Sequence, residues 1–229
     1  MKTIGLLGGM SWESSALYYR LINEETRRRL GGLHSARIVL VSLDFQEVER
    51  LQSQDDWAAA ADLLASAARQ VETAGADFLL ICTNTMHKIA AEVAAAIRIP
   101  LLHLADATAG RIVDAEISTV GLLGTRFTME YEFYKGRLKA RGIDVLTPPA
   151  AGMELVNRVI YEELCLGVIK DDSRSALLEV IDELVQRGAQ AVVAGCTEIG
   201  MLVNEEHTDV MLFDTTRIHA EAAVALALE

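Results

Sequence analysis

The 229 residues of this chain carry a net charge of −12, with 51% hydrophobic and 24% charged residues. This composition is typical of a globular protein with a substantial core, and its acidity argues against a nucleic-acid partner. No apolar run is long enough to span a membrane, the N-terminus lacks a signal-peptide pattern, and three widely spaced cysteines predict no disulfide framework. We therefore expect a reduced, cytoplasmic protein, and the arginine run at 27–29 fits a solvated helix end.

Short apolar runs alternate with helix-length amphipathic segments along the chain. Strands are predicted at 3–7, 36–43, 78–82, 101–103, 119–123, 145–146, 191–194 and 211–213. Helices are predicted at 14–29, 56–73, 86–97, 128–141, 152–165, 173–187 and 215–227. Strands that are apolar on both faces and alternate with helices indicate parallel sheets covered by helices, which is the α/β class.

The sequence also contains an internal repeat. TIGLLG at 3–8 returns as TVGLLG at 119–124, an offset of 116 residues. AGADFLLICTNT at 74–85 returns as RGAQAVVAGCTE at 187–198, an offset of 113 residues. Two matches in the same order at nearly the same offset predict two similar α/β domains, which we place at 1–103 and 104–213.

Four loops at predicted strand ends are rich in small polar residues: 8–15, 82–85, 124–128 and 195–198. Ligands of parallel sheets bind beyond the carboxyl ends of the strands, so these loops form the candidate site. Their hydroxyl and amide side chains can cap the following helices, but together the loops also offer backbone N–H groups to a small carboxylate ligand. GLLGG lacks the spacing of a nucleotide-binding loop.

The three cysteines differ in their predicted settings. Strand alternation turns Cys82 away from the face that Thr83 presents, so Cys82 is predicted to be a core residue. Cys165 falls in a helical pattern. Cys196 follows a strand and precedes a helix, a setting that predicts a lowered thiol pKa and a reactive thiolate.

The motifs CTNTMH (82–87), GCTE (195–198) and IGLLGGMSWESS (4–15) resemble the aspartate/glutamate racemases of the Asp/Glu/hydantoin racemase superfamily. The resemblance covers the whole chain and is strongest to L-aspartate/glutamate-specific or broad amino-acid racemases. It implies two α/β domains related by a pseudo-two-fold axis, an active site in the cleft between them, and a final helix at 214–229 that packs back on the first domain. It further implies an isomerase without pyridoxal phosphate, other cofactor or metal, often dimeric, that acts on a small amino acid.

In that family one cysteine from each domain flanks the substrate's Cα and exchanges its proton. The second cysteine matches Cys196, whereas Thr83 stands at the position of the first. Because an alcohol is a weaker acid than a thiol, the resemblance implies an asymmetric Thr/Cys pair for which L-aspartate or L-glutamate reacts readily. We further expect substrate binding by Met10, Gln52, Asn84, Thr85, Thr125, Thr197 and Glu198, with His87 and Cys165 as supporting residues behind them.

Cys165 stands where related enzymes often carry a lysine that binds the substrate carboxylate, so Gln52, Met10 and Thr125 are predicted to share that role. His103 and His219 are predicted to be structural. A single well-placed thiol leaves two alternatives open. One is a single-cysteine decarboxylase or isomerase of the same superfamily, and the other is an amino-acid-binding protein without catalysis.

Overall fold

The computed structural model describes residues 1–229, and the chain divides into two compact units. The first unit contains Met1–Leu104 and His219–Glu229, and the second contains Ala105–Ile218. The chain thus leaves the first unit one residue after the predicted boundary, and it returns inside its last helix rather than before it. None of the helices combines the length and apolar character needed to cross a membrane.

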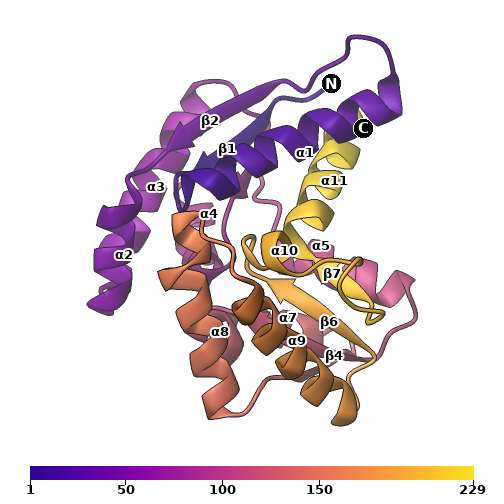
Figure 1. The fold of residues 1–229 in the computed structure, drawn as a ribbon. Helices are drawn as coiled ribbons and strands as arrows, with labels where there is room; N and C mark the ends of the chain where they lie inside the picture. The colour runs from indigo at the N-terminus through magenta and orange to yellow at the C-terminus, as the bar shows by residue number, and fades with distance from the viewer. The chain divides into compact units, whose positions relative to one another are not determined.

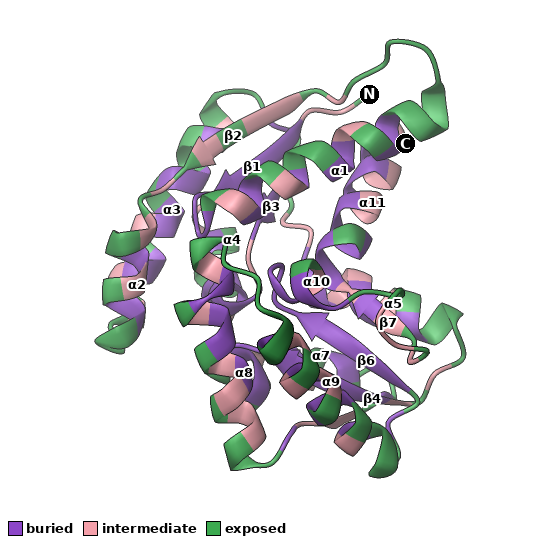
Figure 2. Cartoon of the chain, in the orientation of Figure 1, coloured by how far each residue is buried: buried purple, intermediate pink, exposed green.

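The first unit is built on a parallel three-stranded sheet in the order β2-β1-β3, with β1 and β2 labelled in Figure 1 and β3 in Figure 2. Its strands are β1 (Ile4–Gly8), β2 (Ile38–Ser42) and β3 (Phe78–Ile81). Its helices are α1 (Trp12–Leu30), α2 (Phe45–Ser53), α3 (Trp57–Thr73), the 3-10 helix η1 (Thr85–Ile89), α4 (Ala90–Ala95) and most of α11 (Thr215–Leu228). The predicted strand at 101–103 is reduced to one bridge between Leu79 and Leu101.

Side chains of β1 and β3 alternate between two apolar cores, one on each face of this sheet. Leu7 and Ile81 pack with residues of α2, α3, η1 and α4. Leu6, Leu80 and Cys82 pack with residues of α1 and α11 on the opposite face. Both strands are therefore buried throughout, whereas the edge strand β2 is partly exposed (Figure 2).

The second unit repeats this topology with one more strand, in the order β5-β4-β6-β7, and all neighbours are parallel. Its strands are β4 (Thr119–Gly124), β5 (Asp144–Leu146), β6 (Ala191–Gly195) and β7 (Leu212–Asp214). Its helices are α5 (Leu104–Asp114), α6 (Arg126–Glu130), α7 (Glu132–Lys139), α8 (Ala150–Glu162), the 3-10 helix η2 (Leu164–Leu166), α9 (Asp171–Gln186) and α10 (Ile199–Leu202).

Strand register shows that the pairing of β1 with β3 matches that of β4 with β6. Leu7 pairs with Ile81 in the first sheet, and Leu123 pairs with Ala194 in the second. These pairs are related by the offsets of 116 and 113 residues found in the sequence repeat. Thr83 lies two residues after Ile81, and Cys196 lies two residues after Ala194. These two residues therefore occupy equivalent positions in the two units.

Several helices differ from their predicted extents. Three helices were missed: α2, α5 and α10. Asp44 caps α2 by accepting a hydrogen bond from the Gln46 amide at 3.1 Å, a start signal that the sequence does contain. The predicted helix at 128–141 is interrupted at Tyr131, whose backbone is extended and separates α6 from α7.

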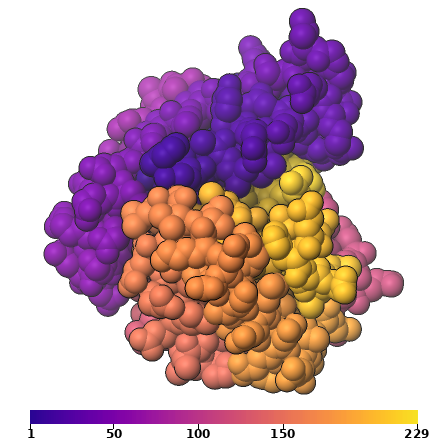
Figure 3. All heavy atoms as spheres, in the orientation of Figure 1, coloured from indigo at the N-terminus to yellow at the C-terminus, as the bar shows by residue number.

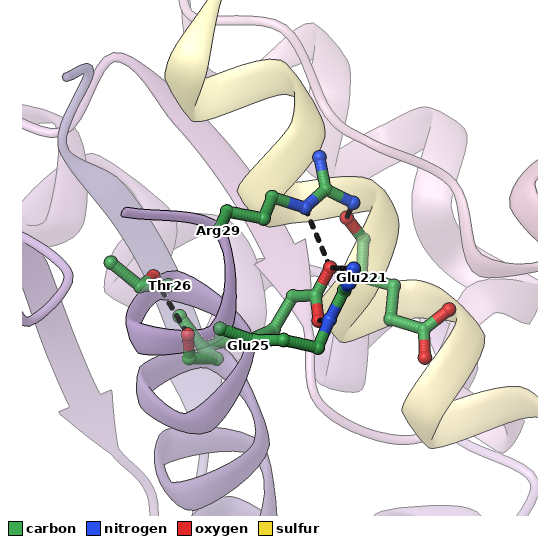
Figure 4. A network of polar contacts seen from close by, with 6 residues as sticks. Glu25, Thr26, Arg29 and Glu221 are labelled. Carbon is green, nitrogen blue, oxygen red and sulfur yellow. Dashed lines mark hydrogen bonds and ion pairs between the residues drawn. The ribbon is translucent and has the colours of Figure 1, made fainter. Parts of the chain in front are cut away.

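A polar network joins α1 to α11 within the first unit (Figure 4). The buried Glu25 accepts hydrogen bonds from Arg28 at 2.6 and 2.7 Å and from Arg29 at 2.6 Å. Arg29 also reaches the Glu221 carbonyl at 3.5 Å. The arginine run therefore does more than face solvent. Helices α1 and α11 share a core, and in the space-filling view C-terminal residues (yellow) meet N-terminal residues (indigo to purple) within this unit (Figure 3).

The Arg28 guanidinium, opposed by burial and assisted by Arg29, lowers the pKa of Glu25 to about 2. We predict that Glu25→Gln lowers the free energy of unfolding at neutral pH by on the order of 1 kcal/mol, because Arg28 is exposed and solvent screens the pair. Since the folded-state pKa lies below the ordinary value of 4.5, the effect is complete above that pH and is lost as the pH falls toward 2.

Urea unfolding at a series of pH values measures this difference. Glu24→Gln is the matched control, since Glu24 is exposed and lies 3.9 Å from its partner Arg20. Equal destabilisation by both substitutions, or a difference between the variants that does not narrow in acid, would contradict the assignment.

Candidate functional site

The loop after β1 is held by its own serine hydroxyls. Ser11 caps α1 by accepting a hydrogen bond from the Ser14 amide at 3.3 Å. Ser15 accepts from the Gly9 amide at 2.7 Å and donates to the Ser11 carbonyl at 2.9 Å. Met10 is buried in the core on the α2 and α3 face. The capping interpretation therefore accounts for Ser11.

The loop after β3 behaves differently. Thr83 is partly exposed, whereas Asn84 and Thr85 are buried. Asn84 precedes η1 but makes no side-chain capping hydrogen bond to it. The Thr83 carbonyl accepts a hydrogen bond from Nδ1 of His87 at 2.8 Å. Capping therefore does not explain Asn84, and His87 holds the backbone of Thr83.

Gln52, on α2, is one of the predicted binding residues and lies beside this loop. Its side chain is buried, and Nε2 lies 2.8 Å from the sulfur of Met86 in η1. The structure thus brings Gln52 to the turn that follows Thr83. Cys82, by contrast, is buried in the core against α1 and α11, and burial raises the pKa of its thiol. This is the placement that strand alternation predicts for Cys82.

In the second unit, the loop after β4 matches the loop after β1. Thr125 is buried and caps α6 by accepting a hydrogen bond from the Thr128 amide at 3.4 Å. Its hydroxyl also lies 3.3 Å from the Thr128 hydroxyl. Ser11 and Thr125 therefore share the same capping role at equivalent strand ends.

Cys196, at the end of β6, is buried and donates its thiol proton to Oε2 of Glu198 at 2.9 Å. Burial, the Glu198 carboxylate and Cys165 raise the pKa of the Cys196 thiol well above its usual value. The prediction of a lowered thiol pKa was wrong for this state of the protein. The following helix, α10, has only four residues, and its dipole does not outweigh burial and the adjacent carboxylate.

Glu198 is therefore a partner of the thiol rather than a helix cap. It stands at the start of α10 but makes no side-chain capping hydrogen bond there. Thr197, between the two, is buried. Sequence reasoning placed Glu198 among the substrate-binding residues and missed its contact with Cys196, although two residues at i and i+2 in a turn can approach one another.

Cys165 lies on η2 and packs against the core that contains Cys196. Glu163, two residues before Cys165, is buried and holds this turn through hydrogen bonds and an ion pair. It accepts a hydrogen bond from Ser173 at 2.6 Å and pairs with Lys170 at 3.3 Å, and the Ser173 contact lowers its pKa. No sequence motif marked Glu163, because its partners lie on the far side of a loop.

Each unit thus presents different chemistry at equivalent positions. The first offers an alcohol, Thr83, on a turn held by a histidine. The second offers a thiol, Cys196, with a carboxylate that can accept its proton. A hydroxyl can donate a proton, and a thiol beside a carboxylate can release and regain one, so both groups are suited to acid–base chemistry.

This chain matches one family profile and several solved structures. The profile of the Asp/Glu/Hydantoin racemase family matches residues 7–223. The crystal structure of a candidate Asp/Glu racemase from Yersinia pestis is 54% identical, with a TM-score of 0.92 over 100% of both chains. That of PH1733, an aspartate racemase homologue from Pyrococcus horikoshii OT3, is 30% identical, with a TM-score of 0.87 over 100% of both chains.

The broad specificity amino-acid racemase RacX from Bacillus subtilis (strain 168) is 24% identical over 163 residues, which cover 69% of this chain and 68% of that protein. The profile match spans both units, and the two structural relatives extend over the full length. Family and structural relatives together support a racemase-type function. The chain belongs to the Asp/Glu/hydantoin racemase family.

Proposed function

We propose that this protein is a cofactor-independent racemase of aspartate or glutamate in which Thr83 and Cys196 exchange the proton on Cα. One observation carries the proposal: strand register makes these two residues equivalent at the carboxyl ends of two repeated sheets. Inversion through a planar carbanion needs an acid and a base on opposite faces. A duplicated fold offers one position for each, provided that both residues reach the same Cα carbon.

Cys196 is the base in this mechanism, and Glu198 generates its reactive form. The raised thiol pKa keeps Cys196 protonated until a substrate ammonium group adds positive charge nearby. The proton then passes from Sγ to Oε2 of Glu198, and the thiolate removes the Cα proton of the L-enantiomer. The substrate carboxylates meet backbone N–H groups and the side chains of Asn84, Thr85 and Thr197.

Thr83 completes inversion by donating its hydroxyl proton to the other face of the carbanion. Water then carries the proton held by Glu198 back to the Thr83 oxygen, which restores the starting protonation of all three residues. An alcohol donates less readily than a thiol, so return of a proton by Cys196 competes with inversion. The asymmetry cannot make the racemase run one way. The enantiomers have equal free energy, so kcat/KM for inversion must be equal in both directions.

The ¹H NMR signal of the Cα proton in D₂O, followed over a panel of L- and D-amino acids, tests the proposal directly. Exchange and inversion of aspartate or glutamate are the expected results. Binding without exchange at Cα would instead indicate an amino-acid-binding protein, and loss of carbon dioxide from a disubstituted malonate would indicate a decarboxylase.

Cys196→Ala is predicted to abolish exchange and inversion, because it removes the base. Cys82→Ala is the matched control, and we expect it to keep most of the activity at some cost in thermal stability, since Cys82 is a core residue. Activity of Cys196→Ala above about a tenth of wild type, which corresponds to a barrier increase of only about 1.4 kcal/mol, would remove Cys196 from the mechanism.

Thr83 variants are predicted to separate exchange from inversion. In D₂O the wild-type protein should deuterate the L-substrate faster than it forms the D-enantiomer. Thr83→Ala should suppress inversion and leave exchange into L, whereas Thr83→Cys should speed turnover of the D-enantiomer about tenfold. If exchange never outpaces inversion and Thr83→Cys leaves D-turnover unchanged, Thr83 is not the second acid.

Glu198→Gln is predicted to lower the pKa of the Cys196 thiol, because the negative charge that disfavours the thiolate is gone. The same change should slow Cα exchange about tenfold, since no group remains to accept the thiol proton. The pH dependence of alkylation by iodoacetamide, measured in a Cys82→Ala/Cys165→Ala background, reports the pKa. An unchanged or higher midpoint would show that Glu198 does not control the thiol.

A further inference from the structure

Three buried histidines lie together in the first unit, behind the turn that carries Thr83. The ring centroid of His87 lies 4.5 Å from that of His103 and 6.0 Å from that of His219. All three side chains are buried. No group of three His, Cys, Asp or Glu side chains is arranged to hold a metal ion. Hydrogen bonds of His87 and His219 instead indicate what these rings do.

Two hydrogen bonds determine which nitrogen of His87 carries the proton. The Leu104 backbone N–H points at Nε2 at 3.2 Å and can only donate, so Nε2 must be the acceptor. The neutral ring then carries its proton on Nδ1. That proton is donated to the Thr83 carbonyl at 2.8 Å. The Leu104 amide thus selects the tautomer that makes His87 a donor to Thr83.

The neighbouring His219 has the opposite tautomer, with its proton on Nε2. Nε2 lies 2.9 Å from the Leu102 carbonyl, which can only accept, so Nε2 carries the proton. Nδ1 then accepts from the Tyr18 hydroxyl at 2.9 Å. Burial, with a smaller contribution from His87, lowers the pKa of His219 to about 3. His219 is therefore neutral at physiological pH and places no charge beside His87.

These bonds attach the Thr83 turn to a well-anchored stretch of backbone. Leu102 donates its amide to the Leu79 carbonyl at 2.9 Å, which ties residues 102–104 to β3. His219 holds the same stretch from α11. On the other side of Thr83, the Cys82 amide is bonded to the Leu7 carbonyl at 2.9 Å. Thr83 is thus fixed from the sheet on one side and from His87 on the other.

We propose that His87 is a positioning residue for Thr83, acting through the hydrogen bond from Nδ1–H to the Thr83 carbonyl. Threonine is β-branched and has few side-chain rotamers, so a fixed backbone directs its hydroxyl. Proton transfer depends steeply on that direction, because a displacement of about 1 Å can cost about a hundredfold in rate. The inference rests on the proposed function, since it assigns His87 to the inversion half of that reaction.

Two substitutions of His87 distinguish the role of Nδ1 from that of Nε2. Asparagine places an amide N–H near the position of Nδ1, whereas glutamine reaches the position of Nε2 and leaves the Thr83 carbonyl without its donor. We expect His87→Gln to lower the ratio of inversion to Cα exchange at least about tenfold, with exchange itself within about threefold of wild type. His87→Asn should keep a ratio close to that of wild type.

His34→Asn is the control, because His34 is exposed in the loop before β2 and its loss should change neither rate. A purely structural role of His87 predicts that glutamine lowers exchange and inversion together, and that result would overturn the proposal. So would a His87→Gln ratio equal to that of wild type, or a His87→Asn ratio as low as that of His87→Gln.

A second readout needs no activity. Nitrogen-15 NMR of histidine-labelled wild-type protein should show one ring protonated on Nδ1, assigned to His87 by its loss in His87→Asn. If the ring assigned to His87 is protonated on Nε2 instead, the proposal is overturned whatever the kinetics. If wild type exchanges no Cα proton of any amino acid while His87 has the expected tautomer, the proposed function fails and the positioning contact stands.

Discussion

Parallel pairing of β1 with β3 and of β4 with β6 is the constraint on which the candidate site depends. In a parallel sheet the register decides which residues emerge together beyond the carboxyl edge. A shift by one residue would turn Cys82 toward the α2 and α3 face and bury Thr83 on the other. The apolar residues before them forbid that shift, because each faces its own core.

The same register separates two kinds of loop. At the ends of β1 and β4, the hydroxyls of Ser11 and Thr125 cap the next helix. At the ends of β3 and β6, Asn84 and Glu198 precede helical turns but do not cap them. Helix capping therefore does not account for these two polar side chains. The chemistry is therefore concentrated in the loops after the third strand of each sheet.

Burial sets the electrostatic character of the loops that carry Thr83 and Cys196. Cys196 lies beside a carboxylate in an apolar setting, so its thiol retains its proton. His87 and His219 are neutral, since each ring is held by one hydrogen-bond donor and one acceptor from the backbone or a tyrosine. The thiol and these two histidine rings are thus held in their neutral forms by their surroundings.

The sequence by itself determined the α/β class, the internal repeat, most strands, and the equivalence of Thr83 with Cys196. These features are local: apolar runs define strands, and a duplicated fold leaves duplicated motifs at a constant offset. The tertiary structure decided what surrounds each group. The Cys196–Glu198 contact, the raised thiol pKa and the tautomer of His87 depend on residues brought together by folding. Burial and hydrogen-bond partners set such properties, and neither can be read from the order of residues along a chain.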